Sequence, residues 1–222
     1  MPRRLFLSAA VIAFTVLSLS SRGMAQTIYW NGNGGSNVGS WNTTTDWWTT
    51  SLGTTNPGAV SGGSIIATFN ATGVSAAQTI TLDANQVVQG LVFSGTDLGG
   101  ETINSGTGTN TLTIGSSGIV DYAGSGADAI NANILLGASQ TWLNNSANTL
   151  TVSGNISDGG QNFGLTFAGI GTTVLSGSNT YAGATAITNN LGTLRLNFSA
   201  ANSPANVTVH EFCPCSVACT PI

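Results

Sequence analysis

Residues 171–196 read GTTVLSGSNTYAGATAITNNLGTLRL, and this stretch decides the fold that we expect. It reads as two short strands of alternating apolar residues joined by the turn-rich segment SGSNTYAG, after which GTLRL opens a further strand. Gly, Ser and Asn supply the positive φ angles and the side-chain-to-backbone hydrogen bonds that tight turns need. The stretch predicts an all-β fold of short strands and tight turns.

The same alternation recurs along the chain, and no segment has a convincing helical period. Aliphatic residues alternate with polar ones, mostly threonine, at 79–82, 111–114, 149–152 and 193–196. A period of two places the aliphatic side chains on one face of each strand and the polar side chains on the other. Each strand is therefore expected to be half buried.

Repetition distinguishes a solenoid from a sandwich or a barrel. NTLTI at 110–114 recurs as NTLTV at 148–152, and GTTV at 171–174 is echoed by GTL at 192–194. Such recurrence is expected when successive coils stack their strands into parallel sheets, with Thr, Ser and Asn forming hydrogen-bonded ladders. We predict a right-handed parallel β-helix over residues 61–206, with about 20 to 30 residues per coil.

Residues 164–202, which contain this stretch, resemble the autotransporter-associated β-strand repeat, also called the passenger-associated transport repeat, of Gram-negative bacteria. IYWNGNGG at 28–35 and GSW at 39–41 extend a looser resemblance over 27–202. The resemblance implies a β-helical passenger exported across the outer membrane, usually through a carboxy-terminal β-barrel of the same chain. No run of amphipathic barrel strands follows in this sequence. The resemblance implies no active site.

The amino-terminal residues predict export. Met1-Pro2-Arg3-Arg4 is a short basic start, residues 5–20 are apolar, and small residues precede Gln26. This order is typical of a signal peptide over residues 1–25, with cleavage after Ala25. A retained membrane anchor is the alternative, although the apolar run is short for a membrane span. We expect the protein to be secreted or at the cell surface of a Gram-negative bacterium.

The scarcity of charge limits the partners. Charged residues make up 5% of the chain, against about 25% in an average soluble domain, and the net charge is −4. Beyond the predicted signal peptide, Arg195 is the only Arg or Lys. Nucleic acids and anionic membrane surfaces are therefore excluded, because both need clustered positive charge. The partners that remain are surface glycans or ligands on host and other cell surfaces.

Aromatic residues are concentrated in the region 26–60. The first hypothesis is that they form an amino-terminal cap, in which bulky side chains seal the open end of the first coil. The alternative is a weak glycan-binding site, because exposed Trp rings stack on the faces of sugars. The residues of that predicted site are Trp30, Trp41, Trp47 and Trp48.

The carboxy-terminal tail, residues 207–222, departs from the repeat composition. It holds the only His and all three Cys, at His210, Cys213, Cys215 and Cys219. The spacing Cys-Pro-Cys-x3-Cys lacks the paired loops and long spacer of a zinc site, so no metal and no cofactor is predicted. A disulfide with one spare thiol is an alternative. We interpret the tail as the product of a truncated or frameshifted reading frame.

Acidic residues are the only catalytic candidates. Glycosidases need two carboxyl groups within about 10 Å, and the acids closest in sequence are Asp97 with Glu101 and Asp121 with Asp128. Both pairs read as solvated turns, so no catalytic residue is predicted. The sequence therefore favours a non-enzymatic structural stalk or adhesin-like scaffold. The alternatives are a β-helix polysaccharide lyase or hydrolase and a glycan-binding module.

Overall fold

The computed structural model describes residues 24–32, 36–53, 55–70, 76–94, 99–188 and 192–197, together with the backbone of strand β18, Val217–Cys219. Residues 1–23 of the predicted signal peptide and the rest of the tail 207–222 lie outside the described residues. Within them, the regular elements are strands and one 3-10 turn, η2 (Thr44–Asp46). The all-β prediction is confirmed.

The strands form two sheets, here called sheet A and sheet B. Sheet A consists of β1 (Gln26–Trp30), β3 (Trp47–Trp48), β4 (Ile65–Phe69), β6 (Gln86–Phe93), β8 (Thr111–Asp121), β10 (Asn133–Leu136), β11 (Gln140–Asn144), β13 (Ile156–Ser157), β14 (Leu165–Gly169) and β16 (Thr185–Ile187). Sheet B consists of β2 (Val38–Ser40), β5 (Gln78–Thr81), β7 (Glu101–Asn104), β9 (Ala129–Ile130), β12 (Thr149–Val152), β15 (Thr172–Leu175), β17 (Thr193–Leu196) and β18.

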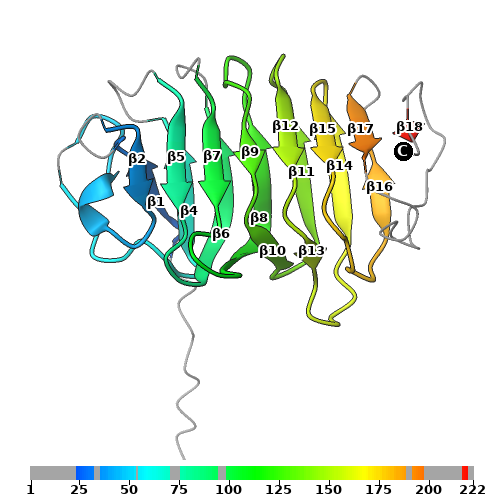
Figure 1. Cartoon of the computed structure of the whole chain (residues 1–222), viewed down its shortest axis with the longest axis horizontal. Helices are drawn as coiled ribbons and strands as arrows, with labels where there is room; N and C mark the ends of the chain where they lie inside the picture. Colours follow the sequence, from blue (N-terminus) through cyan, green and yellow to red (C-terminus); the bar gives the residue numbers. More distant parts are fainter. Residues whose placement is uncertain are drawn as a thin grey trace, which may run out of the picture.

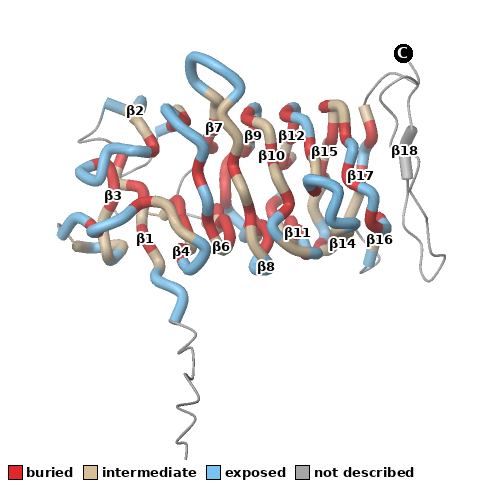
Figure 2. Tube along the Cα trace, turned by 90° about the horizontal axis from the view of Figure 1, so that it is seen from below, coloured by how far each residue is buried: buried red, intermediate tan, exposed pale blue. Residues whose placement is uncertain are grey.

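Both sheets run the length of the molecule, with their strands across its long axis, and they lie on opposite sides of the interior (Figures 1 and 2). The chain passes from sheet A to sheet B in each coil, and neighbouring strands come from successive coils. Pairing is parallel between all of these coils, as in β12 with β15 and β11 with β14. The predicted parallel β-solenoid is therefore confirmed. Between the pairs Val88–Ile114 and Gly90–Gly118, β8 has residues 115–117 opposite Gln89 alone, which is a bulge in β8. Sheet A bends there, so that the first halves of β6 and β8 form a short third side with β10 and β13.

Continuous ladders of apolar side chains fill the interior. Strand register places Ile80, Ile103 and Ile130 next to one another in sheet B, and all three are fully buried. This ladder continues through Val152, Leu175 and Leu196, and sheet A contributes the facing ladder Leu91, Ile119, Trp142 and Phe167. Each coil thereby removes the apolar row of its neighbour from water, which is the dominant stabilising term.

Polar ladders connect the coils at their corners. Asn131 Nδ2 donates to Asn104 Oδ1 at 2.9 Å, and Ser153 Oγ donates to Asn131 Oδ1 at 2.5 Å. A second ladder joins the backbone N–H of Asn155 to Asn133 Oδ1 at 3.1 Å. The expected coil-to-coil hydrogen bonds between short polar side chains are confirmed, and they need no charged group.

The recurring sequence motifs correctly predict where strands form, but they do not predict whether each strand belongs to sheet A or sheet B. Thr172 and Thr193 lie directly side by side, so GTTV and GTL occupy equivalent positions in adjacent coils. The other pair of motifs does not occupy equivalent positions, because residues 111–114 lie in sheet A and residues 149–152 lie in sheet B. The motif encodes a half-buried strand after a turn, and both sheets need that local pattern.

Candidate functional site

Three tryptophan rings pack together at the amino-terminal end of the solenoid. The ring centroids of Trp30 and Trp47 are 5.2 Å apart, and those of Trp41 and Trp47 are 5.0 Å apart. Phe69 of the next coil meets Trp47 at 5.8 Å and stacks on Phe93 at 5.1 Å. The cluster therefore joins the end of the solenoid to the apolar ladder of sheet A.

Each buried indole of this cluster has a hydrogen-bond acceptor. Trp30 Nε1 donates to Gln78 Oε1 at 3.2 Å, Trp41 Nε1 to the carbonyl oxygen of Val60 at 2.8 Å, and Trp47 Nε1 to that of Trp41 at 3.1 Å. Because a buried N–H without an acceptor is costly, these bonds fix the rings in one arrangement. The cluster is thus a specific packing unit.

The same segment covers the first edges of both sheets. Strand β3 pairs with β1 in antiparallel orientation and occupies the edge of sheet A. At the edge of sheet B, Asp46 Oδ2 accepts the backbone N–H of Ser40 at 3.2 Å. Gly39 permits this approach, because a Cβ there would lie 2.6 Å from Asp46 Oδ2 and 2.5 Å from the Trp30 ring. The arrangement protects edges that would otherwise template aggregation.

The structure contradicts a sugar-stacking role for three of the four predicted glycan-binding residues. Trp30, Trp41 and Trp47 are at most 1% exposed, and a ring with no accessible face cannot stack on a sugar. Trp48 points to the outer face of β3 and is half-buried. Because adjacent strand residues face opposite sides, Trp47 and Trp48 could not share one surface. Glycan binding stays a prediction for Trp48 alone.

The acidic residues are also placed differently from the expectation of solvated turns. Glu101, Asp121 and Asp128 are 1%, 0% and 1% exposed, so that expectation is wrong for these three. The physical reason is the alternation of β8, which brings Asp121 to the same side as Ile119. That alternation was the signal in the sequence that could have revealed the inward direction. Asp97 lies outside the described residues.

Asp128 and Asp121 have different environments. Asp128 Oδ1 accepts the backbone N–H of Glu101 at 2.8 Å, and Asp128 Oδ2 accepts the hydroxyl of Ser125 at 2.5 Å. Neither carboxylate oxygen of Asp121 has a partner in full hydrogen-bond geometry, and the nearby hydroxyl of Ser125 donates to Asp128. Burial, reinforced by the negative charge of Asp128, raises the pKa of Asp121 to about 7, against a smaller lowering effect of Ser125. The pair is enclosed in the core and does not face a substrate cleft.

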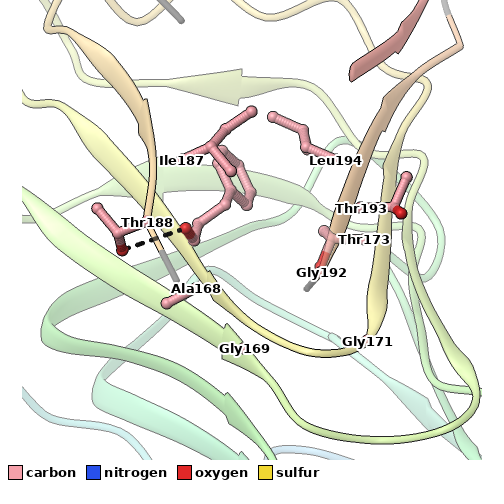
Figure 3. Close-up of a pocket in the computed structure, with 10 residues that line it drawn as sticks. Ala168, Gly169, Gly171, Thr173, Ile187, Thr188, Gly192, Thr193 and Leu194 are labelled. Carbon is pink, nitrogen blue, oxygen red and sulfur yellow. Dashed lines mark hydrogen bonds between the residues drawn. The ribbon is translucent and has the colours of Figure 1, made fainter. Parts of the chain in front are cut away.

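A small cavity lies at the far end of the described solenoid, between β16 and β17. Ile187 and Leu194 point toward one another there, and Thr188 Oγ1 donates to the carbonyl oxygen of Phe167 at 3.5 Å (Figure 3). The cavity measures about 10 Å³, which is room for a single water at most. The residues that link the two strands, 189–191, lie outside the described part of the chain.

A shallow groove of about 320 Å³ crosses the outer face of sheet A. Small and hydroxyl-bearing side chains line it, and none of its lining residues is charged. The strand register places Thr141, Thr166 and Ala186 in a row along it. The groove offers hydrogen-bonding groups without a titratable side chain, so it contains no acid–base pair.

The fold is a parallel β-solenoid with a cluster of tryptophan rings at its amino-terminal end. Comparison of the chain with protein-family models, with curated proteins and with solved structures found no match. Within the described ranges, no group of three or more His, Cys, Asp or Glu residues is arranged to hold a metal ion. No helix in the described part of the chain has the length and apolar character needed to cross a membrane.

Proposed function

We propose that the chain is a non-enzymatic, secreted or surface-exposed passenger segment of the autotransporter type, acting as a structural stalk or adhesin-like scaffold. The observation that carries this proposal is the continuity of the buried ladders, which run from β5 to β17. A protein built as one uninterrupted stack extends along its axis by adding coils. Length and a regular surface are the properties that a stalk needs.

The positions of the acids support the scaffold over the alternative of a β-helix lyase or hydrolase. A glycosidase needs two carboxyl groups that reach the scissile bond from opposite sides. Glu101, Asp121 and Asp128 lie inside the stack, where a polysaccharide chain cannot reach them. The uncharged groove on sheet A has no carboxylate to act in their place.

A screen of the full chain against a panel of polysaccharides tests this proposal, with reducing ends and unsaturated products as readouts. We expect product formation no higher than in buffer. Glu101→Gln and Asp121→Asn serve as variants in the same screen. Cleavage by the wild-type chain that is abolished in either variant would show an enzyme and contradict the scaffold.

Glycan binding is a second candidate function, favoured by the uncharged groove and by the half-buried Trp48. Neutral sugars are bound by hydroxyl-bearing side chains and by aromatic faces. The groove lies over β11, β14 and β16, whereas Trp48 lies on β3 at the opposite edge of sheet A, so they are two separate candidate surfaces. Retention on immobilised polysaccharides is the measurement. If Trp48→Ala abolishes retention and leaves thermal unfolding unchanged, a binding surface at Trp48 is established.

A further inference from the structure

Asp121 belongs to an interior row of paired side chains, and its neighbours in that row are apolar or fully hydrogen-bonded. Strand register places it between Phe93 on β6 and Asn144 on β11. Asn144 satisfies both ends of its amide, because Nδ2 donates to the carbonyl oxygen of Thr172 and Oδ1 accepts the N–H of Ser146, each at 2.8 Å. The Asp121 carboxyl group is fully buried, and neither of its oxygens has a partner in full hydrogen-bond geometry, since the nearby Ser125 hydroxyl donates to Asp128.

The charged neighbour of this position is acidic. Asp128, immediately before β9, acts on Asp121 through its negative charge, and it accepts the backbone N–H of Glu101 on β7. At the paired positions, β6 and β11 present Phe93 and Asn144. Arg195, the only basic residue in the described ranges, is exposed on β17, and β12 and β15 separate β17 from β9. No cation is thus available in the described core to compensate a second buried negative charge, and such a charge is expensive.

We propose that Asp121 is a proton-binding site inside the solenoid, and that the neutral carboxyl group holds the end of β8 in its native packing. Loss of the proton places an unpaired charge between the ring of Phe93 and the amide of Asn144, close to Asp128. The stability of this coil therefore depends on pH, although the rest of the interior is apolar.

The direction in which stability changes with pH follows from the raised pKa of Asp121. The carboxyl group has a pKa of about 3.9 in an unfolded chain and of about 7 in the fold, so the folded state binds one more proton between these values. The stabilisation is complete below about pH 4, falls as the pH rises, and is lost above about pH 7. The folding equilibrium constant is expected to fall by up to tenfold per pH unit over this window.

Equilibrium unfolding of the full chain in urea between pH 5 and pH 8 tests the proposal. Asp121→Asn removes the titration, and Asn144 shows that an asparagine fits the same ladder position in the next coil. We expect the wild-type folding constant, divided by that of the variant, to fall by about tenfold per pH unit from pH 5 to about pH 7. A ratio that does not change with pH would overturn the proposal.

Two matched variants locate the effect. Asp83→Asn removes an exposed carboxylate and should leave the wild-type pH dependence intact. Asp128→Asn removes the neighbouring negative charge, so the decline in stability should end at a lower pH than in the wild type. Equal effects of Asp83→Asn and Asp121→Asn would assign the dependence to general charge and contradict a specific site.

A measurement on the wild-type chain covers the case in which Asp121→Asn does not fold. Carbon-13 NMR of labelled aspartate, correlated with the backbone, reports the protonation of the Asp121 carboxyl group directly. We expect its signal to titrate with a midpoint near 7. A midpoint in the ordinary range, near 4, would show that the buried group is ionised in the fold and would refute the proposal.

Discussion

Trp47→Ala is expected to lower the free energy of unfolding by about 3 to 5 kcal/mol, the cost of removing a large aromatic side chain from a packed core. Trp47 contacts the rings of Trp30, Trp41 and Phe69 and donates its indole N–H inside the cluster. Its loss leaves a cavity in the ring cluster at the amino-terminal end of the solenoid. Urea unfolding at one fixed pH measures the effect.

Trp48→Ala is the matched control, because it removes the same side chain from the adjacent position on the outer face of β3. We expect a loss of about 1 kcal/mol or less for this half-buried ring. Equal losses for Trp47→Ala and Trp48→Ala would show that the aromatic segment does not seal the solenoid in the way that the geometry indicates.

Gly169→Ala should destabilise the stack by roughly 2 to 4 kcal/mol, through backbone strain and overpacking together. Gly169 has a φ of +103°, which L side chains rarely adopt. A Cβ there would also lie 2.0 Å from the carbonyl oxygen of Asn144 in the preceding coil. The Cβ position is fixed by the backbone of residue 169, and the oxygen belongs to the backbone of Asn144, so no side-chain rotation relieves the contact. Thermal unfolding followed by circular dichroism reports the loss.

Gly63→Ala provides the comparison for this substitution. Apart from Gly63 itself and its two chain neighbours, no atom lies within 4 Å of a Cβ built there, so the change should alter the unfolding temperature very little. If Gly169→Ala and Gly63→Ala had equally small effects on the unfolding temperature, the result would contradict a close approach of successive coils at Gly169.

Local pattern accounts for the part of the fold that could be predicted from the sequence. The alternation at 149–152 and 193–196 is found as β12 and β17, with the aliphatic residues inward. Short polar residues form the expected ladders between coils. These features depend on neighbours along one strand and on repetition between strands, and both are visible in the sequence.

The direction of individual side chains at the site was harder to predict, because residue type competes with alternation. Asp121 looks like a turn residue by chemistry, yet its spacing from Ile119 directs it inward. Trp30 follows Ile28 at the same spacing and is buried with it. The opposite directions of Trp47 and Trp48 follow from the same rule. Strand parity was a better guide than residue type at each of these positions.

The assignment of strands to sheets depends on information that no single motif carries. NTLTI and NTLTV are nearly identical, yet they lie in sheet A and sheet B. The lengths of the intervening turns and the bulge in β8 decide which side of a coil each motif reaches. These long-range determinants accumulate along the chain and cannot be read from a window of five residues.

The central claim of a secreted scaffold is tested most directly by the intact mass of the full chain after expression in a Gram-negative host and fractionation of the cells. We expect the protein outside the cytoplasm, with a mass that begins at Gln26, the residue that opens β1. A chain found only in the cytoplasm, with residues 1–25 still attached, would contradict the account.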